Sequence, residues 1–432
     1  MRFELPKGTR DFLPEEKILR DCIINTLKET FELYGYNPLE TPALEMYETL
    51  SSKYAGGSEI LKEIYTLTDN AKRKLALRYD LTVPLARVIA SNPALKKPFK
   101  RYQIDRVWRD GPIKLGRYRE FWQCDADVIG IKSMLADAEL LALANSFFKK
   151  INLDVTICVN NRKLLNSILD IYNIQKEKQE SIIITLDKIK KIGIKGVAAE
   201  LKKKNISDKA IKALLELFNA KNKDDYKLID KLDKLLKEKE GINEIKELLY
   251  YCKEFNLDNV KLEISMARGL SYYTGTVFEI FINNGSLSCS LAAGGRFDSM
   301  ISNFMNSREE VPAVGISFGL DTLMDAVTLN KKIQLKKSTT LVYIIPIDAK
   351  KECIKIAKSL RDQGIKCDMD LVGRSITKNL EYVNKLNIPY ALIIGSDELK
   401  QKKLKLKDMA SGKEKLLNIE VIFKELKKQN SD

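Results

Sequence analysis

The period-two pattern between residues 121 and 128 constrains the fold of this chain more than any other feature. Trp122, Cys124, Ala126 and Val128 form an apolar row, and the residues that alternate with them are Phe121, Gln123, Asp125 and Asp127. Such alternation is typical of a β-strand that packs one face against a core and uses the other face. We therefore expect a strand here, joined by a turn to a second strand that begins near Phe99.

The turn of this hairpin is strongly basic. It holds four cationic residues together with two glycines and a proline: Arg109, Lys114, Arg117 and Arg119. Cationic side chains beside a strand with polar groups on one face suit a polyanionic ligand such as a nucleoside triphosphate. An ordinary solvated hairpin with a charged tip explains the same pattern equally well.

The composition bounds the class of protein. A length of 432 residues predicts two to four domains with ample core. The net charge of +15 favours a polyanionic partner such as nucleic acid, although the lysine excess also fits a merely soluble surface. The seven cysteines are scattered, and we find neither a signal peptide nor a membrane-spanning run. We expect a cytoplasmic protein with no membrane partner.

The chain contains no histidine. This excludes Ser-His-Asp hydrolysis, Cys-His catalysis and histidine-ligated metals. Any chemistry must therefore depend on carboxylates, arginines, backbone groups or a hard ion such as Mg²⁺.

The composition and the predicted secondary structure change twice along the chain. Lysine-rich amphipathic helices are predicted for about 168–255, and their lysines fit a solvated face better than an RNA contact. Strands then return at Val260–Ser265, Val277–Ile282 and Leu287–Ala292. After a polar linker, residues 341–394 follow a strand–helix–strand–helix–strand order, which predicts a small α/β domain with a partly parallel sheet.

Several motifs together resemble one family, the histidyl-tRNA synthetases of the archaeal and eukaryotic type. The most specific stretch is Arg268-Gly-Leu-Ser-Tyr-Tyr273-Thr-Gly, and it occurs with KGTRDFLP, LRYDLTVPLAR and GRYREF-x-QCD in the family order. Three class II motifs resemble the segment up to Pro42, residues 106–127 and residues 312–323. The resemblance implies an α+β catalytic domain with a mainly antiparallel sheet, a helical insertion and a C-terminal α/β domain with a mixed sheet that binds the anticodon.

The resemblance also implies domain limits and an activity. The catalytic domain would comprise 1–167 and 256–328, the helical insertion 168–255 and the anticodon-binding domain 339–432. The chain would be a homodimer that activates histidine with ATP and Mg²⁺, then transfers it to the 3′ end of tRNA-His. In-line attack at phosphorus depends on positioning and charge neutralisation, so a site without histidine side chains is no obstacle.

Roles for single residues follow from the resemblance. Arg109 and Arg268 would hold the α-phosphate and act as the catalytic cations, and they also belong to the histidine site. Arg117 and Phe121 would complete the ATP site, with Phe121 stacked on adenine. The α-ammonium group of histidine would bind Asp80, Thr82 and Gln123. The imidazole nitrogens would bind Asp127 and Tyr273, with Tyr272 beside them. No residue is expected to ligate a metal.

One departure from the family pattern concerns the third motif. Asp321 and Thr322 stand where a Glu-Arg pair is expected, so either another cation replaces that arginine or ATP binding is weaker. Two alternatives stay open on the residues. The regulatory subunit of ATP phosphoribosyltransferase shares the catalytic fold and senses histidine, but such paralogues usually lack the C-terminal domain. Class II synthetases for Thr, Pro or Gly lack the paired tyrosines.

Overall fold

The computed structural model describes residues 3–52, 60–113, 116–219, 225–266, 272–283, 287, 289–329 and 336–429. Contacts divide the chain into two compact units, one formed by residues 1–10 and 23–331, the other by residues 11–22 and 332–432. Arg268 and Lys114 of the expected site and basic turn lie outside the described residues.

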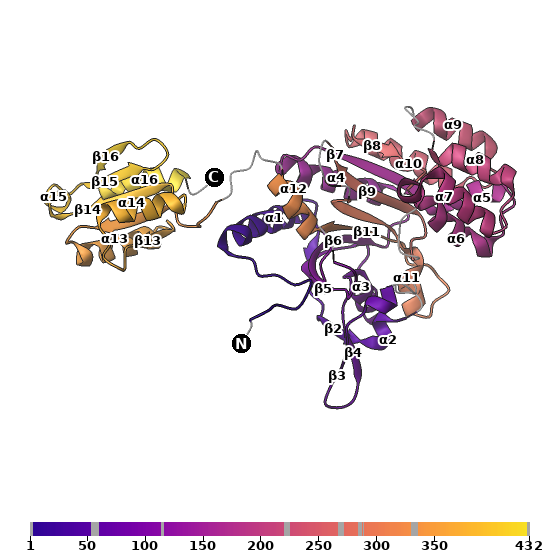
Figure 1. Cartoon of the computed structure of the whole chain (residues 1–432), viewed down its shortest axis with the longest axis horizontal. Helices are drawn as coiled ribbons and strands as arrows, with labels where there is room; N and C mark the ends of the chain where they lie inside the picture. Colours follow the sequence, from indigo (N-terminus) through magenta and orange to yellow (C-terminus); the bar gives the residue numbers. More distant parts are fainter. Residues whose placement is uncertain are drawn as a thin grey trace. The chain divides into compact units, whose positions relative to one another are not determined.

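A large sheet organises the first unit (Figure 1). Its strands within the described residues are β1 (Asn37–Pro38), β5 (Phe99–Trp108), β6 (Glu120–Ile129), β7 (Val155–Asn161), β8 (Val260–Leu262), β9 (Thr276–Ile282), β10 (Ala292–Arg296) and β11 (Ala313–Gly319). They lie in the order β1-β5-β6-β11-β10-β9-β7-β8. The outer pairs β1–β5 and β7–β8 are parallel, and the inner pairs are antiparallel. The expected mainly antiparallel sheet is confirmed.

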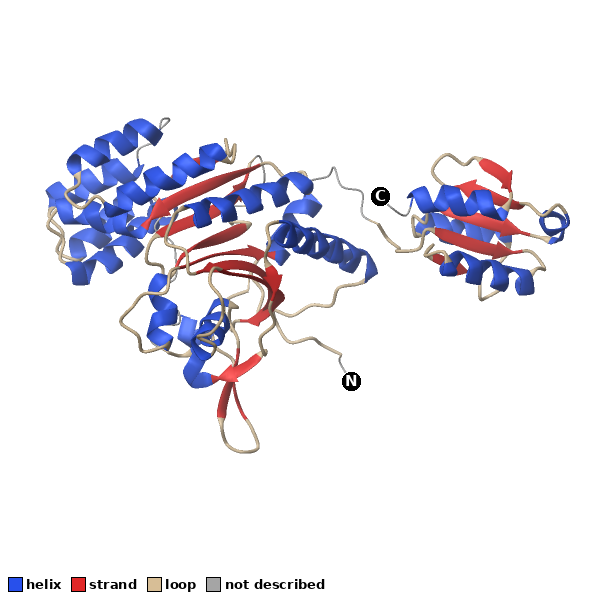
Figure 2. Cartoon of the chain, turned by 180° about the vertical axis from the view of Figure 1, so that it is seen from behind, coloured by secondary structure: helices blue, strands red, loops and turns tan. Residues whose placement is uncertain are grey.

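The hairpin β5–β6 forms as predicted, and its alternation separates two faces. Cys124 and Ala126 are fully buried, and Phe318 of β11 lies opposite Cys124 on the same face. The ring of Phe318 is 5.3 Å from Phe147 and 5.9 Å from Phe148, centroid to centroid, on helix α4 (Leu135–Lys150). Figure 2 shows the helix crossing the sheet. The apolar row therefore packs under α4, and the polar row of β6 is left for the other face.

Smaller elements surround this sheet in the first unit. Helices α3 (Thr82–Ser91) and α11 (Asp298–Phe304) share a buried cluster that includes Leu85, Ile89 and Met300. Ile129 at the end of β6 belongs to the same cluster, so the start of α3 is held beside β6. The remaining elements here are the part of α1 (Pro14–Leu33) from Ile23 onward, β2 (Leu44–Met46), α2 (Tyr47–Leu50), the 3₁₀ turn η1 (Ile60–Glu63), β3 (Thr66–Thr68), β4 (Lys74–Leu77) and α12 (Leu320–Leu329).

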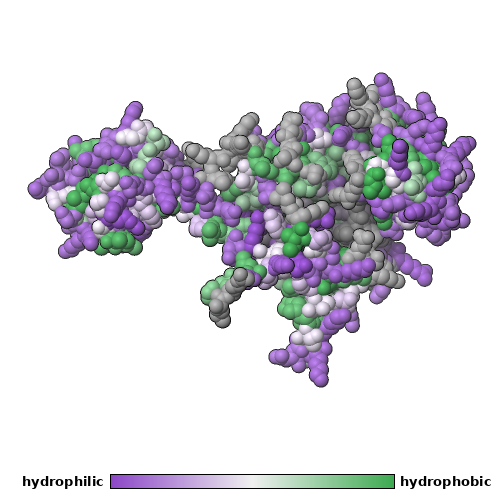
Figure 3. Space-filling model, in the orientation of Figure 1, coloured by the Kyte–Doolittle hydropathy of each residue, from purple (hydrophilic) through white to green (hydrophobic). Residues whose placement is uncertain are grey.

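A group of helices lies between β7 and β8 in sequence. It comprises α5 (Arg162–Ile171), α6 (Lys176–Asp187), α7 (Ile189–Lys203), α8 (Asp208–Asn219), α9 (Asp225–Leu235) and α10 (Glu240–Glu254). Asn161 begins the group, because its side chain accepts hydrogen bonds from Lys163 N (2.8 Å) and Leu164 N (3.2 Å). One apolar core runs from Leu164 through Leu214 to Ile264. The outer face of these helices in Figure 3 is largely hydrophilic.

The second unit contains the predicted small α/β domain. Its elements are β12 (Val342–Pro346), α13 (Lys350–Asp362), β13 (Cys367–Met369), α14 (Ile376–Lys385), β14 (Tyr390–Ile394), α15 (Ser396–Lys400), β15 (Leu404–Asp408), β16 (Glu414–Leu417) and α16 (Ile419–Gln429). The described strand order is β13-β12-β14-β15-β16. Because β12 pairs in parallel with β13 and β14, while β15 and β16 are antiparallel, the sheet is mixed as expected.

The strand expected at Leu287–Ala292 is wrong in its position. The structure begins β10 at Ala292 and continues it through Gly294 and Gly295. A Cβ atom on Gly294 would overlap the Phe278 ring and a backbone oxygen, and one on Gly295 would lie 3.0 Å from the Tyr273 ring. The glycines are therefore strand residues whose missing side chains make room for neighbouring aromatic rings.

Candidate active site

The polar face of β6 forms one wall of a cavity of about 390 Å³ in the first unit. Gln123, Asp125 and Asp127 all line it, which confirms the predicted alternation. The β6–β11 register places Gly319, Ser317 and Gly315 opposite these three residues, in that order. A Cβ atom on Gly315 would overlap Oδ1 of Asp127. Glycine at that position therefore gives the Asp127 carboxylate its space.

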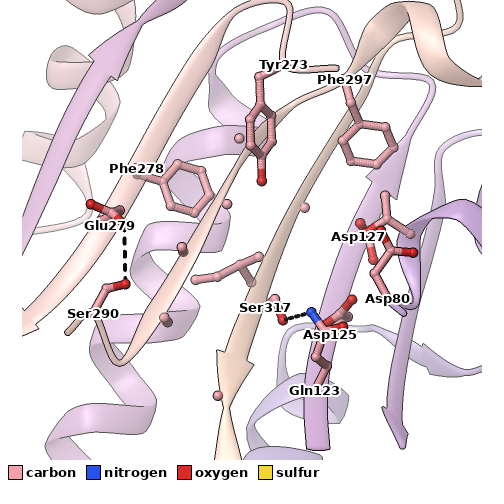
Figure 4. Close-up of a pocket in the computed structure, with 18 of the residues that line it drawn as sticks. Asp80, Gln123, Asp125, Asp127, Tyr273, Phe278, Glu279, Ser290, Phe297 and Ser317 are labelled. Carbon is pink, nitrogen blue, oxygen red and sulfur yellow. Dashed lines mark hydrogen bonds between the residues drawn. The ribbon is translucent and has the colours of Figure 1, made fainter. Parts of the chain in front are cut away.

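Seven of the expected site residues meet at this cavity. They come from the start of α3, the hairpin and the segment before β9: Asp80, Thr82, Arg109, Gln123, Asp127, Tyr272 and Tyr273. Figure 4 shows Asp80, Asp125 and Asp127 on one side, with Phe278, Glu279 and Ser290 on the other and Tyr273 pointing in between them. Residues far apart in sequence thus converge as the motif order implies.

Two other expected residues are described but do not line the cavity. Phe121 lies at its edge, since the guanidinium carbon of Arg109 is 5.2 Å from the centre of the Phe121 ring. Arg117 follows Gly116 in the basic turn and is exposed. Arg268 lies outside the described residues, so its expected role stays a prediction.

Local hydrogen bonds fix the orientation of two of the site residues. Oδ1 of Asp80 accepts a hydrogen bond from Val83 N (3.0 Å) in the first turn of α3. Arg109 donates from Nε to the carbonyl oxygen of Tyr79 (2.9 Å), which joins the basic turn to the segment before α3. The start of α3 therefore positions both an acid and a cation at the cavity.

Asp80, Asp125 and Asp127 form an acidic wall of the cavity. A buried arginine that the sequence analysis did not single out lies behind this wall. Arg101 is fully buried on β5, directly opposite Asp127 in the hairpin register. Its Nη2 lies 2.8 Å from Oδ2 of Asp127, an ion pair without hydrogen-bond alignment, and donates to Leu81 O at 3.1 Å. The local sequence gives no signal for this contact, because it depends on the register across a long turn.

Burial dominates the electrostatics of the three aspartates. It raises the pKa of Asp80 and of Asp127 to about 7, and that of Asp125 to about 6. The Asp125 charge raises the pKa of the other two further, whereas Arg101 lowers the pKa of Asp125 and Asp127. The wall is therefore costly to ionise without a cationic ligand.

Tyr273 also lines the cavity, and its hydroxyl can donate a hydrogen bond, whereas the aspartates accept. Burial raises the pKa of Tyr273 well above its ordinary value, so its hydroxyl stays protonated at neutral pH. The rings of Tyr272 and Tyr273 are in contact, with centroids 4.8 Å apart. The cavity thus sets a neutral donor across from an acidic wall.

Sequence reasoning also missed a pair of polar contacts at the cavity. Ser317 lies beside the polar row, and Gln123 Nε2 donates to its Oγ at 2.9 Å. Ser290 Oγ donates to Glu279 Oε1 at 3.3 Å on the other side. A serine in an apolar strand and a glutamate in β9 were the available signals, and neither is specific by itself.

The third-motif departure lies beside the cavity in the first turn of α12. Asp321 is buried, and its Oδ1 accepts from Arg10 Nη2 (2.8 Å) while its Oδ2 accepts from Trp122 N (3.2 Å). The Arg10 guanidinium also lies over the Tyr118 ring, 4.3 Å from its centre. Thr322 is buried next to Gly319. A cation from the N-terminal segment is therefore fixed beside the position where the family arginine is expected.

The described residues show neither of two other classes of site. They contain no group of three or more histidine, cysteine, aspartate or glutamate side chains arranged to hold a metal ion. None of their helices combines the length and the apolar character needed to cross a membrane.

Two family models match the chain. The model of histidyl-tRNA synthetases matches residues 8–323, well over half of the chain, and the anticodon binding domain matches residues 341–429. The chain belongs to the histidyl-tRNA synthetase family.

Individual members of the histidyl-tRNA synthetase family agree with this assignment. The histidine–tRNA ligase 1 of Bacillus cereus is 46% identical over 423 residues, which cover 96% of this chain and 95% of that protein. A crystal structure of histidyl-tRNA synthetase from Nostoc sp. PCC 7120 has a TM-score of 0.89 at 30% identity, covering 99% of this chain and 100% of that one. These relatives are bacterial, so they give no support to the expected archaeal and eukaryotic type.

A further solved structure bears on the fold alone. It comes from Bacillus halodurans, is described as an ATP phosphoribosyltransferase regulatory subunit/histidyl-tRNA synthetase, and has a TM-score of 0.75 at 24% identity. It covers 91% of this chain and 98% of its own. The family fold is thus common to proteins described by either name.

Proposed function

We propose that this chain is a histidine–tRNA ligase that converts histidine and ATP to histidyl-adenylate and pyrophosphate, then transfers the histidyl group to the 3′ end of tRNA-His. The observation that carries the proposal is that Asp80, Arg109, Gln123, Asp127 and Tyr273 all line one cavity. Relatives named histidine–tRNA ligase that align along nearly the whole chain support it. Their bacterial origin favours a bacterial type of the enzyme.

The acidic wall supplies a seat for the amino acid. Asp80, Thr82 and Gln123 bind the α-ammonium group, because carboxylate, hydroxyl and amide oxygens accept its N–H groups. Asp127 accepts from one imidazole nitrogen, and the Tyr273 hydroxyl donates to the other, with Tyr272 packed beside it. An apolar competitor would leave these buried groups unpaired, which discriminates by about 10⁴–10⁵-fold in comparable sites.

The arginines position ATP for in-line attack by the histidine carboxylate. Arg109 binds the α-phosphate and that carboxylate, and its hydrogen bond to Tyr79 O keeps it in place. Phe121 stacks on adenine, Arg117 adds charge at the phosphates, and Arg268 is the second cation at the α-phosphate. These groups stabilise the charge that develops on the phosphoryl oxygens, and no side chain has to remove a proton from a carboxylate that is already ionised.

Magnesium enters this proposal with the nucleotide. Mg²⁺ binds triphosphate oxygens and keeps several waters, so it needs few protein ligands. When bound, the ion would neutralise phosphate charge, and the protein side chains would do the positioning.

Transfer of the histidyl group requires tRNA to reach the cavity. The anticodon binding domain matched at residues 341–429 supports a tRNA partner, and the net charge of +15 favours the phosphate backbone. We include the expected domain limits in the proposal: 1–167 with 256–328, 168–255, and 339–432. Homodimer formation through the first class II motif and a cytoplasmic location are also part of it.

ATP–pyrophosphate exchange tests the proposed function. The purified full chain is incubated with Mg²⁺, labelled pyrophosphate and each standard amino acid in turn. Exchange with histidine alone is the expected result. Exchange with no amino acid, in a chain that still binds histidine, would instead support the regulatory paralogue, and exchange with Thr, Pro or Gly would support another class II specificity.

The role proposed for Arg268 has its own test. Arg268→Ala is expected to abolish exchange and to leave histidine binding largely intact, because the arginine acts on the phosphate. A parallel loss of histidine binding would make Arg268 a substrate-holding residue instead.

A further inference from the structure

Asp125 is a buried acid that the proposed mechanism leaves without a task. It lies on β6 between Gln123 and Asp127, lines the same cavity and is 2% exposed. Its Oδ1 has no hydrogen-bond partner in the described part of the chain. A buried acceptor without a donor costs about 1–3 kcal/mol, and more when it is charged. Such an atom at a cavity wall points to a donor on the ligand.

Asp125 is one of four residues that share this property. The other cavity-lining side chains with an unpartnered buried oxygen, counted within the described ranges, are Asp80 (Oδ2), Gln123 (Oε1) and Asp127 (Oδ2). A histidine with a neutral ring offers four N–H groups, three on the ammonium and one on the ring. These oxygens can accept from such N–H groups, and among the four, as far as the structure describes the chain, only Oδ2 of Asp127 also lies near a cation, 2.8 Å from Nη2 of Arg101. The Tyr273 hydroxyl remains to donate to the second ring nitrogen.

The position of Asp125 assigns it to the ammonium part of the ligand. In the sheet register Asp125 is opposite Ser317, the residue whose Oγ accepts from Gln123 Nε2 (2.9 Å). Its charge also raises the pKa of Asp80, so the two carboxylates are electrostatic neighbours. Asp80, Thr82 and Gln123 are the proposed ammonium ligands, and Asp125 lies next to Asp80 and Gln123. Asp127 is farther along β6, where Arg101 pairs with it.

The charge balance agrees with this assignment. Three carboxylates share the wall, and arginines act on them, among these the buried Arg101 on Asp125 and Asp127, and the cavity-lining Arg109 on Asp80 and Asp125. A monovalent cation therefore relieves part of the remaining repulsion when it binds among them. An ammonium group fits that requirement, whereas a second phosphate or carboxylate opposes it.

We propose that Asp125 is a third carboxylate of the histidine seat and accepts a hydrogen bond from the α-ammonium group beside Asp80 and Gln123. The inference rests on the proposed function and adds a specificity-determining residue to it. The competing structural role is that Asp125 serves only as a counter-ion to Arg101, whose Nε and Nη1 also have no partner among the described residues.

Three ligands separate these roles by equilibrium binding to the full chain. L-histidine has the ring, the ammonium and the carboxylate; histidinol lacks the carboxylate; imidazolepropionate lacks the ammonium. For Asp125→Asn we expect histidine and histidinol to bind about 10–100-fold more weakly, the loss typical of a hydrogen bond to a charged group. Imidazolepropionate is expected to bind within twofold of the unchanged chain.

Matched controls keep the result interpretable. Asp127→Asn should weaken all three ligands, because it removes a ring contact. Thermal unfolding of each variant verifies folding, and Asp125→Ser, which keeps a small acceptor, replaces Asp125→Asn if the latter does not fold. In pyrophosphate exchange, Asp125→Asn should raise KM for histidine and leave KM for ATP unchanged.

Two outcomes overturn the inference. Unchanged histidinol affinity in Asp125→Asn would show that the ammonium does not use this carboxylate. Equal losses for all three ligands and for ATP would show a counter-ion role to Arg101. A separate result, absence of histidine binding by the unchanged chain, would overturn the proposed function itself.

Discussion

Two buried arginine–aspartate pairs in the first unit differ in what their polar atoms contact. Arg296 and Asp137 lie 2.6 Å apart, and Arg296 also donates to Ile131 O (2.9 Å) and Ser133 O (2.8 Å). Arg101 and Asp127 lie 2.8 Å apart, but they stand in a row of acids that face a cavity. Each aspartate has one buried oxygen without a hydrogen bond in the described residues, Oδ1 of Asp137 and Oδ2 of Asp127, but only Asp127 lines the cavity. Burial alone therefore does not mark a functional acid; unpartnered oxygens at a cavity do.

The largest expected effect concerns the contribution of the Arg296–Asp137 pair to stability. Arg296→Met leaves Asp137 buried beside an apolar group, and we expect the free energy of unfolding to fall by about 3–5 kcal/mol. Denaturant unfolding measures this value. The double variant Arg296→Met/Asp137→Leu should recover much of the loss. A loss below about 1 kcal/mol in the single variant would remove the structural role of the pair.

The second prediction concerns ligand binding by Asp127, the acid of the Arg101–Asp127 pair. Asp127→Ala should weaken histidine binding by about 10²-fold or more, since a charged acceptor for the ring is lost. ATP binding should be unchanged, because Asp127 belongs to the acidic wall and not to the phosphate-binding arginines. Isothermal titration with each ligand measures both values. Unchanged histidine affinity would sink the assignment.

The third prediction uses the pH dependence of stability to contrast Asp80 at the cavity with Asp137 in its ion pair. Burial raises the pKa of Asp80 to about 7, above that of a free aspartate, so the folded chain retains a proton that the unfolded chain has released. This contribution to stability is present at low pH and is lost as the pH rises through 7. Asp80→Asn should therefore stabilise the ligand-free chain by about 2 kcal/mol at pH 8 and have little effect at pH 4.

Unfolding measured at pH 4 and pH 8 provides the check, and Asp137→Asn is the matched control. Burial also raises the pKa of Asp137, to about 6, but at pH 8 Asp137→Asn should destabilise the chain, because it leaves Arg296 buried without its carboxylate partner. The chain has no histidine side chains, so they contribute nothing to the titration near pH 7. Stabilisation by both variants, or by neither, would erase the proposed distinction.

The smallest effect is expected for an exposed pair on the same hairpin. Arg106 and Glu120 lie 3.6 Å apart with half-exposed and partly exposed side chains. Arg106→Ala should change the free energy of unfolding by less than about 1 kcal/mol. A larger loss in the same denaturation assay would show that hairpin charges stabilise the fold, which the comparison does not anticipate.

Periodic patterns predicted much of the fold because they record local burial. The alternation at residues 121–128 indicated both the strand and the face that lines the cavity, and the strand–helix order after residue 341 indicated the mixed sheet. The strand at 292–296 was misplaced, since Gly294 and Gly295 have no side chains to show a period. Its reason lies in the rings of Phe278 and Tyr273, which come from elsewhere in the chain.

Site residues that belong to a sequence motif were predictable. Residues that reach the site only through strand pairing were less so. Asp80, Gln123, Asp127 and Tyr273 belong to motifs, and they meet at the cavity. Arg101 and Ser317 reach the acidic wall only through pairings across β5–β6 and β6–β11. Such pairings depend on the length and conformation of the intervening chain, which short-range patterns do not specify.

The place of β6 in the sheet has a consequence during synthesis of the chain. Its first neighbour, β5, precedes it directly, but Gln123 and Ser317 of its second neighbour are 194 positions apart. At roughly 5–20 residues per second, the ribosome needs about 10–40 s to supply β11. Until then β6 is an open edge, and inward-facing charges on such an edge oppose pairing with another nascent strand. The aspartates that later face the ligand therefore also oppose aggregation through the unpaired edge of β6.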